Sequence, residues 1–302
     1  MIEQFQATLP HGITLSCRAA GPQGAPLLMF LHGFPEAAFV WDGLLEHFAG
    51  RFRGVAPNLR GFERSSAPAE IEAYRAKHLV ADISALIDQQ GGPLQALIAH
   101  DWGGAVAWNL AVQQPHKLRR LVIINSPHPA TFLRELQHSP QQQAASAYMN
   151  FLCRPDAEAL LAQNDFARMW SLFNNMGAID RPSPSNPGGG WLTDAVKEQY
   201  RQVWRAGLTG GCNYYRASPL RPPTADNSAV MQLRFPAEFV TVTLPTRVVW
   251  AEDDIALGLS LLDGLEAFVP NLQLVRVPGA THWIVHEQPG LIAAQIDAAL
   301  QA

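Results

Sequence analysis

The chain has 302 residues, and its hydrophobic content of 48% is enough for one large core with an inserted subdomain. A net charge of −4 without a basic run argues against nucleic acid and membrane surfaces as partners. Three widely spaced cysteines form neither a metal-ligand pattern nor a disulfide framework, so we expect no metal or other cofactor and a reducing interior. We expect a cytoplasmic protein, because the first residues do not form a signal peptide and no apolar stretch is of membrane-spanning length.

The first half of the chain alternates predicted strands and helices. Residues 2–19 indicate two strands joined by a turn, and the continuous apolar run at 27–31 is typical of a buried parallel strand. The elements predicted after it are a helix at 39–48, a strand at 52–57, a helix at 78–90, a strand ending at 98, a helix at 104–112 and a strand at 121–124. Such alternation implies right-handed crossovers and a parallel central sheet.

The alternation stops between residues 129 and 238, where short helical pieces and Pro- and Gly-rich stretches predict an inserted helical lid with a flexible excursion near 182–190. It resumes with a strand at 247–250, a helix at 259–268, a strand at 272–277 and a closing helix at 288–299. We therefore predict an α/β core, with a mostly parallel sheet and helices on both faces. Residues 1–128 and 239–302 form this core, and residues 129–238 form the lid.

Residues 99–103 read Ala-His-Asp-Trp-Gly, between a predicted strand and a predicted helix. Small residues two before and two after the central position are typical of a nucleophile elbow, where a strained turn crowds the strand and helix backbones. The usual occupant of the centre is Ser, but here it is Asp101. An Asp before a helix is also a common N-cap, and this alternative stays open from the motif alone.

An Asp at the elbow favours attack on saturated carbon. Ser attacking such a carbon would form an ether, which an activated water does not cleave. A carboxylate forms an ester, and a second step can release it. The chemistry therefore points to opening an epoxide or expelling a halide, and disfavours an ordinary esterase.

Two further groups have the chain order expected of a triad. Asp253 and Asp254 follow a predicted strand, and His282 follows the last strand, giving the order nucleophile, acid, His. In this arrangement neutral His282 takes a proton from the water that attacks the Asp101 ester, and the acid holds the imidazole.

Four segments together resemble the α/β-hydrolase-fold epoxide hydrolases. Residues 32–36 read His-Gly-Phe-Pro-Glu, residues 100–104 His-Asp-Trp-Gly-Gly, residues 251–254 Ala-Glu-Asp-Asp and residues 281–283 Thr-His-Trp. The likeness covers nearly the whole chain and implies the α/β-hydrolase fold, with Asp254 as the acid. It also implies an oxyanion hole made by the backbone N–H groups of Phe34 and Trp102.

The same resemblance implies two lid tyrosines that protonate the departing epoxide oxygen. In the family the first tyrosine begins a Tyr-x-x-aromatic motif, which residues 148–151 match with Tyr148. The second belongs to an Asn-aromatic-Tyr-Arg motif, which residues 213–216 match with Tyr215, and Tyr214 is an alternative. The implied reaction hydrolyses a small apolar epoxide to a vicinal diol. We also expect apolar lid residues to contact the substrate, among them Phe151, Trp170 and Met176.

Two other functions remain open. Haloalkane dehalogenases also place Asp-Trp at the elbow, and pair it with an Asn in the oxyanion loop or with a lid Trp. Phe34 occupies the Asn position, whereas Trp170, Trp191 or Trp204 could supply the lid indole. Haloacetate dehalogenases carry Arg directly after the nucleophile, where this chain has Trp102. A non-catalytic small-molecule receptor with a lidded pocket is the third alternative.

Overall fold

A single eight-stranded sheet forms the centre of the computed structural model, which describes residues 1–178 and 188–301. The strand order is β1-β2-β4-β3-β5-β6-β7-β8. β2 pairs antiparallel with β1 and β4, and the remaining neighbours pair in parallel. The strands are β1 (Glu3–Thr8), β2 (Thr14–Ala20), β3 (Leu27–Leu31), β4 (Arg53–Pro57), β5 (Ala96–His100), β6 (Leu121–Ile124), β7 (Thr246–Ala251) and β8 (Leu272–Val277).

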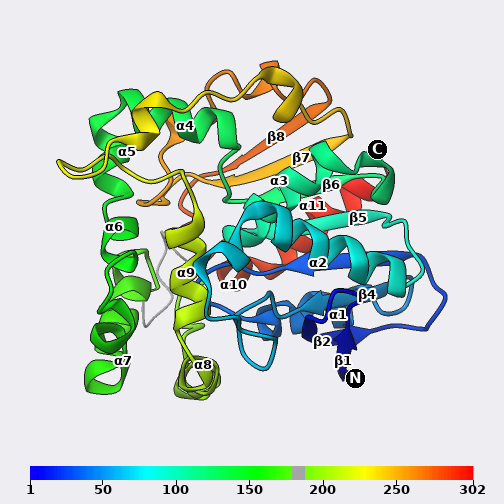
Figure 1. Cartoon of the computed structure of the whole chain (residues 1–302). Coiled ribbons are helices and arrows are strands. Elements are labelled where there is room, and N and C mark those ends of the chain that lie inside the picture. Colours follow the sequence, from blue (N-terminus) through cyan, green and yellow to red (C-terminus); the bar gives the residue numbers. More distant parts are fainter. Residues whose placement is uncertain (179–187, 302) are drawn as a thin grey trace.

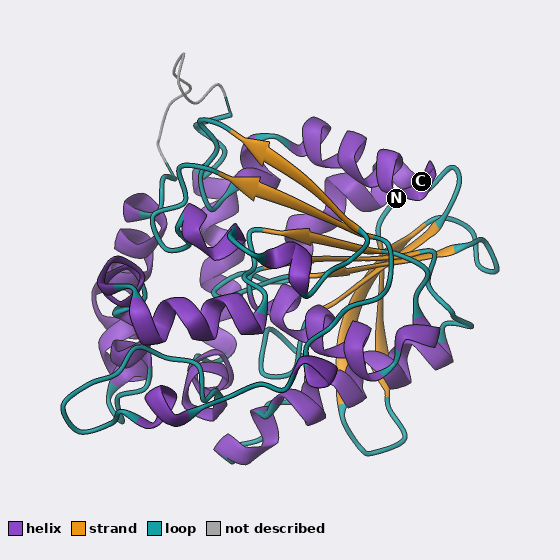
Figure 2. Ribbon diagram, turned by 90° about the horizontal axis from the view of Figure 1, so that it is seen from above, coloured by secondary structure: helices purple, strands orange, loops and turns teal. Residues whose placement is uncertain are grey.

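Helices cover both faces of the sheet, as Figure 2 shows. Side chains alternate between faces along each strand, so β5 sends Ala96 and Ile98 into one core cluster and Leu97 and Ala99 into the other. The first cluster packs under α1 (Asp42–Phe48) and α11 (Pro289–Gln301), and the second under α2 (Ala76–Gln89) and α3 (Trp102–Gln113). The fold is the predicted α/β arrangement.

The described residues between β6 and β7 include a series of helices and lie at one end of the sheet (Figure 1). We call residues 129–238 the lid, keeping the boundaries proposed from the sequence. Its helices are α4 (Pro129–His138), α5 (Pro140–Ala145), α6 (Tyr148–Leu152), α7 (Ala157–Asn175), α8 (Asp194–Ala206) and α9 (Thr209–Ala217). Backbone angles outside the helical region interrupt α7 at residues 163–166. Of the excursion predicted near 182–190, residues 182–187 lie outside the described residues.

One predicted element is wrong. Residues 259–268 do not form a helix but two short 3₁₀ turns, Leu259–Leu262 and Leu265–Ala267. Gly264 between them has φ 72°, a left-handed conformation that a continuous helix does not accommodate. The short α10 (Ile284–Glu287) precedes α11. Among the described helices, none is both long and apolar enough to cross a membrane.

Candidate active site

Asp101 lies at the sharp turn between β5 and α3. Its φ of 49° and ψ of −121° are strained for a residue with a side chain. The surroundings are crowded: a Cβ at Gly33 would lie 2.3 Å from the Asp101 Cβ, and one at Gly103 would lie 2.4 Å from the Leu31 carbonyl oxygen. Among the described N–H groups of α3, none donates a capping hydrogen bond to the Asp101 side chain. The N-cap alternative therefore does not account for this residue.

The two carboxylate oxygens of Asp101 have different surroundings. Oδ1 accepts a hydrogen bond of 2.7 Å from the backbone N–H of Phe34. Oδ2 lies 4.0 Å from His282 Nε2. Trp102 is the first residue of α3, where backbone N–H groups have no partner within the helix. The Asp101 backbone carbonyl accepts a hydrogen bond of 2.7 Å from the Ser126 hydroxyl, which fixes the turn from the neighbouring strand.

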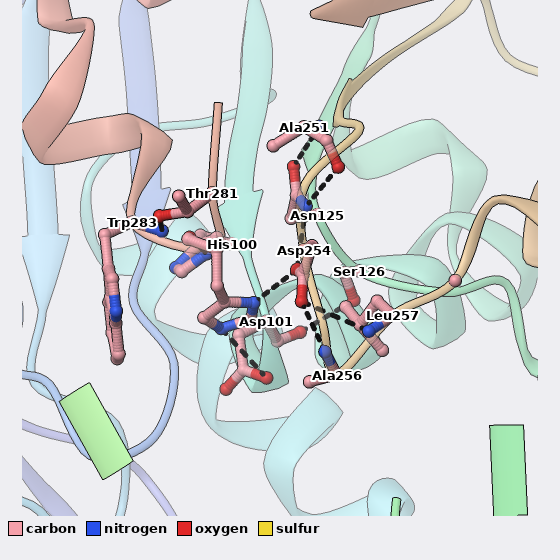
Figure 3. A network of polar contacts seen from close by, with 12 residues as sticks. His100, Asp101, Asn125, Ser126, Ala251, Asp254, Ala256, Leu257, Thr281 and Trp283 are labelled. Atoms are coloured by element: carbon pink, nitrogen blue, oxygen red, sulfur yellow. Dashed lines mark hydrogen bonds and ion pairs between the residues drawn. The ribbon is translucent and has the colours of Figure 1, made fainter. Parts of the chain in front are cut away.

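The carboxylate that faces His282 belongs to Asp254, while Asp253 is exposed. Asp254 Oδ2 lies 2.6 Å from His282 Nδ1 and accepts a 2.8 Å hydrogen bond from the Asn125 amide. Oδ1 accepts hydrogen bonds from the N–H groups of Ala256 and Leu257, as Figure 3 shows. Burial raises the pKa of Asp254, but His282 and these hydrogen bonds outweigh burial and hold it below its usual range.

Asn125 is a site residue that the sequence reasoning missed. It follows β6 with φ 37°, and its amide oxygen accepts a 2.8 Å hydrogen bond from the Ala251 N–H. Its amide therefore joins the end of β7 to the Asp254 carboxylate (Figure 3). The signal was present in the chain, because Asn125 and Ser126 come directly after an apolar strand, where parallel sheets place functional groups.

His282 lies between the two carboxylates and is buried. Burial lowers its pKa, but Asp254 and then Asp101 raise it to about 9. The backbone carbonyl of His282 accepts a 3.0 Å hydrogen bond from His100 Nε2 when that nitrogen carries the proton. Both carboxylates therefore favour the protonated form of the imidazole.

Tyr148 and Tyr215 lie together over the nucleophile. Their ring centroids are 6.0 Å apart, and the Tyr215 ring packs edge-on against Phe34 and Trp102 at 5.3 and 5.1 Å. Burial raises the pKa of both phenols, and the nearby Asp101 carboxylate raises each further, so both hydroxyls keep their protons. Tyr214 has a different role, because its hydroxyl donates a 3.0 Å hydrogen bond to the Arg60 carbonyl.

Asp101, Trp102 and the two tyrosines border a cavity of about 540 Å³. Its walls come from α3, the beginnings of α2, α4 and α6, the end of α9 and residues between 218 and 240. Phe151, Trp170 and Met176 are not among the described residues that line it. Their assignment to the substrate stays a prediction that this cavity does not support.

Glu36 forms a buried network behind the site that sequence reasoning also missed. One carboxylate oxygen lies 2.7 Å from the Tyr200 hydroxyl of the lid and 2.6 Å from His286 Nε2. The other lies 3.3 Å from His100 Nδ1. Burial raises the pKa of Glu36, but His286 and His100 lower it well below its usual range. A charged Glu36 thus joins the oxyanion loop, the lid and the residue before Asp101.

The chain is similar to known proteins along most of its length. A family model described as alpha/beta hydrolase fold matches residues 26–289. The chain is 34% identical over 286 residues to the AB hydrolase superfamily protein YfhM of Bacillus subtilis, covering 93% of this chain and 92% of that protein. The chain therefore belongs to the α/β-hydrolase fold family.

Within that family, several of the similar proteins are epoxide hydrolases by name. The chain is 32% identical over 295 residues to mouse epoxide hydrolase 4, covering 96% of this chain and 77% of that protein. A crystal structure of Bacillus megaterium epoxide hydrolase with an inhibitor superposes with a TM-score of 0.87 at 28% identity, covering 99% of this chain and all of the other. The chain is a hydrolase of the α/β-hydrolase-fold epoxide hydrolase family.

Proposed function

We propose that this protein hydrolyses an epoxide to a vicinal diol through a covalent ester on Asp101. The observation that carries the proposal is the pairing of two groups across one cavity. The carboxylate of Asp101 is held at the Phe34 N–H, and two protonated tyrosines border the same space. A nucleophile that faces acids is the arrangement that ring opening requires, because the departing oxygen must gain a proton.

In the first step Asp101 Oδ2 attacks an epoxide carbon. A new C–O bond forms, the ring C–O bond breaks, and Tyr148 or Tyr215 transfers a proton to the ring oxygen. Oδ2 is assigned as the attacking oxygen because Oδ1 accepts the Phe34 hydrogen bond. Oδ1 then becomes the ester carbonyl oxygen.

In the second step His282 takes a proton from water, and the hydroxide oxygen adds to the Asp101 ester carbonyl. Negative charge develops on Oδ1, where the N–H groups of Phe34 and Trp102 stabilise it. The bond to the diol oxygen then breaks, and that oxygen takes the proton held by His282. The Asp101 carboxyl group formed in this step gives its own proton to His282, which restores the starting state. Ring opening leaves a tyrosine phenolate, which takes the proton of the His282 imidazolium. Ester formation also removes the Asp101 charge that helps raise the pKa of His282, so a neutral imidazole is available for the second step.

Dehalogenation fits the site less well. Its halide would need a second indole N–H besides that of Trp102. The Trp170 indole donates to the Asp165 carbonyl and the Trp204 indole to the Pro35 carbonyl. Neither of these residues, nor Trp191, is among the described residues lining the cavity. A receptor would need no triad, whereas Asp254 and His282 are joined at 2.6 Å.

A trapping experiment separates the three functions. His282→Gln leaves the nucleophile but removes the base, so the ester should accumulate for intact-mass analysis. With styrene oxide we expect a gain of the whole epoxide mass on the peptide that contains Asp101. With 1-chlorohexane, a dehalogenase would gain the alkyl group alone and release chloride.

The matched control is the double variant His282→Gln with Asp101→Ala, which should form no adduct. An adduct on any other residue would overturn the mechanism. The absence of an adduct across a panel of epoxides would favour the receptor.

A further inference from the structure

The cavity at Asp101 is elongated along α3. Asp101, Ala105, Asn109 and Gln113 all line it, and their spacing of four places them along one stripe of the helix. At a rise of about 1.5 Å per residue, the cavity floor extends about 18 Å from the nucleophile to Gln113. The space is therefore long compared with an epoxide ring, and most of it lies away from the reacting carbon.

The α3 side of the cavity leaves space because its side chains are small or are hydrogen-bonded to their own helix. Ala105 lies one turn from Asp101, and the Asn109 amide donates a 2.8 Å hydrogen bond to the Ala105 carbonyl on its own helix. The opposite wall is apolar, with Phe132, Leu220 and Val240 among its residues. A hydrocarbon chain would meet mostly carbon there, and its burial is favourable in proportion to the area removed from water.

The described residues that line the cavity offer no cation to an anionic substituent. Among the described residues that line it, Asp101 is the one carboxylate, and none is a lysine or arginine. His128 is uncharged at neutral pH because burial lowers its pKa to about 4. Its Nε2 also lies 2.8 Å from the Val240 carbonyl. A carboxylate in this space would lose its hydration without gaining a cation.

The far end of the cavity opens to solvent. Ala76, Gln113 and Pro219 line it and are exposed. Phe239 lines it as well, with an exposed fraction of 68% that is unusual for a phenylalanine. The opening lies between the beginning of α2, the end of α3 and the loop after α9, so a chain longer than the cavity can extend outward over an apolar surface.

We propose that the substrate is a neutral epoxide with a long apolar substituent, whose tail lies along the Ala105–Gln113 stripe of α3 and leaves beside Phe239. The epoxide ring lies at the inner end, between Asp101 and the two tyrosines. This inference rests on the proposed function and adds the substrate class. Side chains along the α3 stripe then determine the tail length that the site accepts.

The wild-type protein tests the proposal with a series of terminal epoxides. We expect kcat/KM for 1,2-epoxydecane to be at least about tenfold above that for 1,2-epoxybutane, since each buried methylene adds a factor of about four. For 5,6-epoxyhexanoate we expect kcat/KM at least about tenfold below that for 1,2-epoxyhexane at pH 8. Equal values in either pair would overturn the proposal. Failure of every epoxide to give a diol would instead refute the proposed function.

Two variants locate the tail. Ala105 and Val112 both line the cavity. Ala105→Phe narrows it about 6 Å along the helix from Asp101, and Val112→Phe narrows it about 16 Å away. In Ala105→Phe we expect the enzyme to hydrolyse only epoxides with short tails. In Val112→Phe we expect the maximum tail length to decrease only slightly. The matched control is Ala144→Phe on the exposed surface of α5, outside the cavity lining, which should keep the wild-type length profile. A loss of activity that is uniform over all tail lengths in both cavity variants would contradict the assigned path.

Discussion

The two flanks of the lid differ in how they meet the core. On one flank, which we call the packed flank, the aromatic residues Phe173, Trp191, Tyr200, Trp204 and Trp283 are in mutual contact. The Phe173 and Trp283 rings stack at 4.2 Å, and the Trp283 indole donates a 3.0 Å hydrogen bond to the Phe173 carbonyl. On the other flank the lid and α3 enclose the cavity of about 540 Å³. The packed flank therefore holds the lid against the core, and the other flank leaves room for a substrate.

The packed flank also fixes parts of the active site. The Trp204 indole donates a 2.8 Å hydrogen bond to the Pro35 carbonyl, and the Tyr200 hydroxyl contacts Glu36 in the same loop. That loop supplies the Phe34 N–H to Asp101. Aromatic residues with polar tips thus hold the oxyanion loop from the lid, without entering the cavity.

The largest expected effect is the loss of a packed ring. Phe173 is fully buried, so Phe173→Ala should lower the free energy of unfolding by about 3 to 5 kcal/mol. The matched change is Phe132→Ala, because Phe132 is a buried lid phenylalanine that faces the cavity. It should cost roughly half as much or less, since fewer contacts are lost beside existing space. Urea unfolding measures both, and equal losses would contradict the distinction between the flanks.

Tyr148 of α6 and the two tyrosines of α9 provide the next comparison. Tyr148→Phe and Tyr215→Phe should each slow ester formation by tens- to hundreds-fold, equivalent to about 2 to 3 kcal/mol of barrier, because each removes a donor to developing charge. Tyr214→Phe should leave single-turnover ester formation within about threefold of wild type, since it removes a bond to a backbone carbonyl. Stopped-flow measurement of the first turnover tests all three. Wild-type rates in both Tyr148 and Tyr215 variants, with a slow Tyr214 variant, would transfer the role to Tyr214.

Glu36 gives the packed flank a pH dependence. In the folded protein the pKa of Glu36 lies well below the ordinary value for Glu. In the unfolded chain its pKa is about 4.3, which is that ordinary value. Its charge therefore stabilises the fold above that pH, and the contribution is lost as the pH falls. Glu36→Gln should lower stability by roughly 2 kcal/mol at pH 7 and by less near pH 3. Unfolding curves at both pH values measure this, and a cost that does not change with pH would exclude a charged Glu36.

The order of strands and helices could be predicted because buried parallel strands are continuous apolar runs. The elbow could also be predicted, since its small residues are adjacent in the chain. The helix expected at 259–268 failed at Gly264, whose φ of 72° depends on local turn geometry. Asn125 and Glu36 were missed because their partners, Asp254 and His286, are remote in the sequence.

The lid residues were the hardest to predict. Apolar periodicity marks a buried face, but it does not distinguish packing against the core from lining a cavity. Trp170 and Met176 are on or beside α7, which meets the core through Phe173 and Trp283. Ala105 and Asn109, which line the cavity, have side chains too small or too polar to suggest a substrate site. Whether a substrate meets Trp170 and Met176 or Ala105 and Asn109 depends on tertiary packing alone.

The smallest expected effect tests that choice directly. The Trp170 ring lies 4.5 Å from the Trp204 ring, and its indole donates to the Asp165 carbonyl. Trp170→Leu should change KM for 1,2-epoxydecane by less than about twofold, because the residue lies outside the cavity lining. Its stability should fall by about 1 kcal/mol, the typical loss for a point mutation. A tenfold rise in KM with unchanged stability would instead mean that the substrate contacts the packed flank, and the distinction between the two flanks would then be wrong.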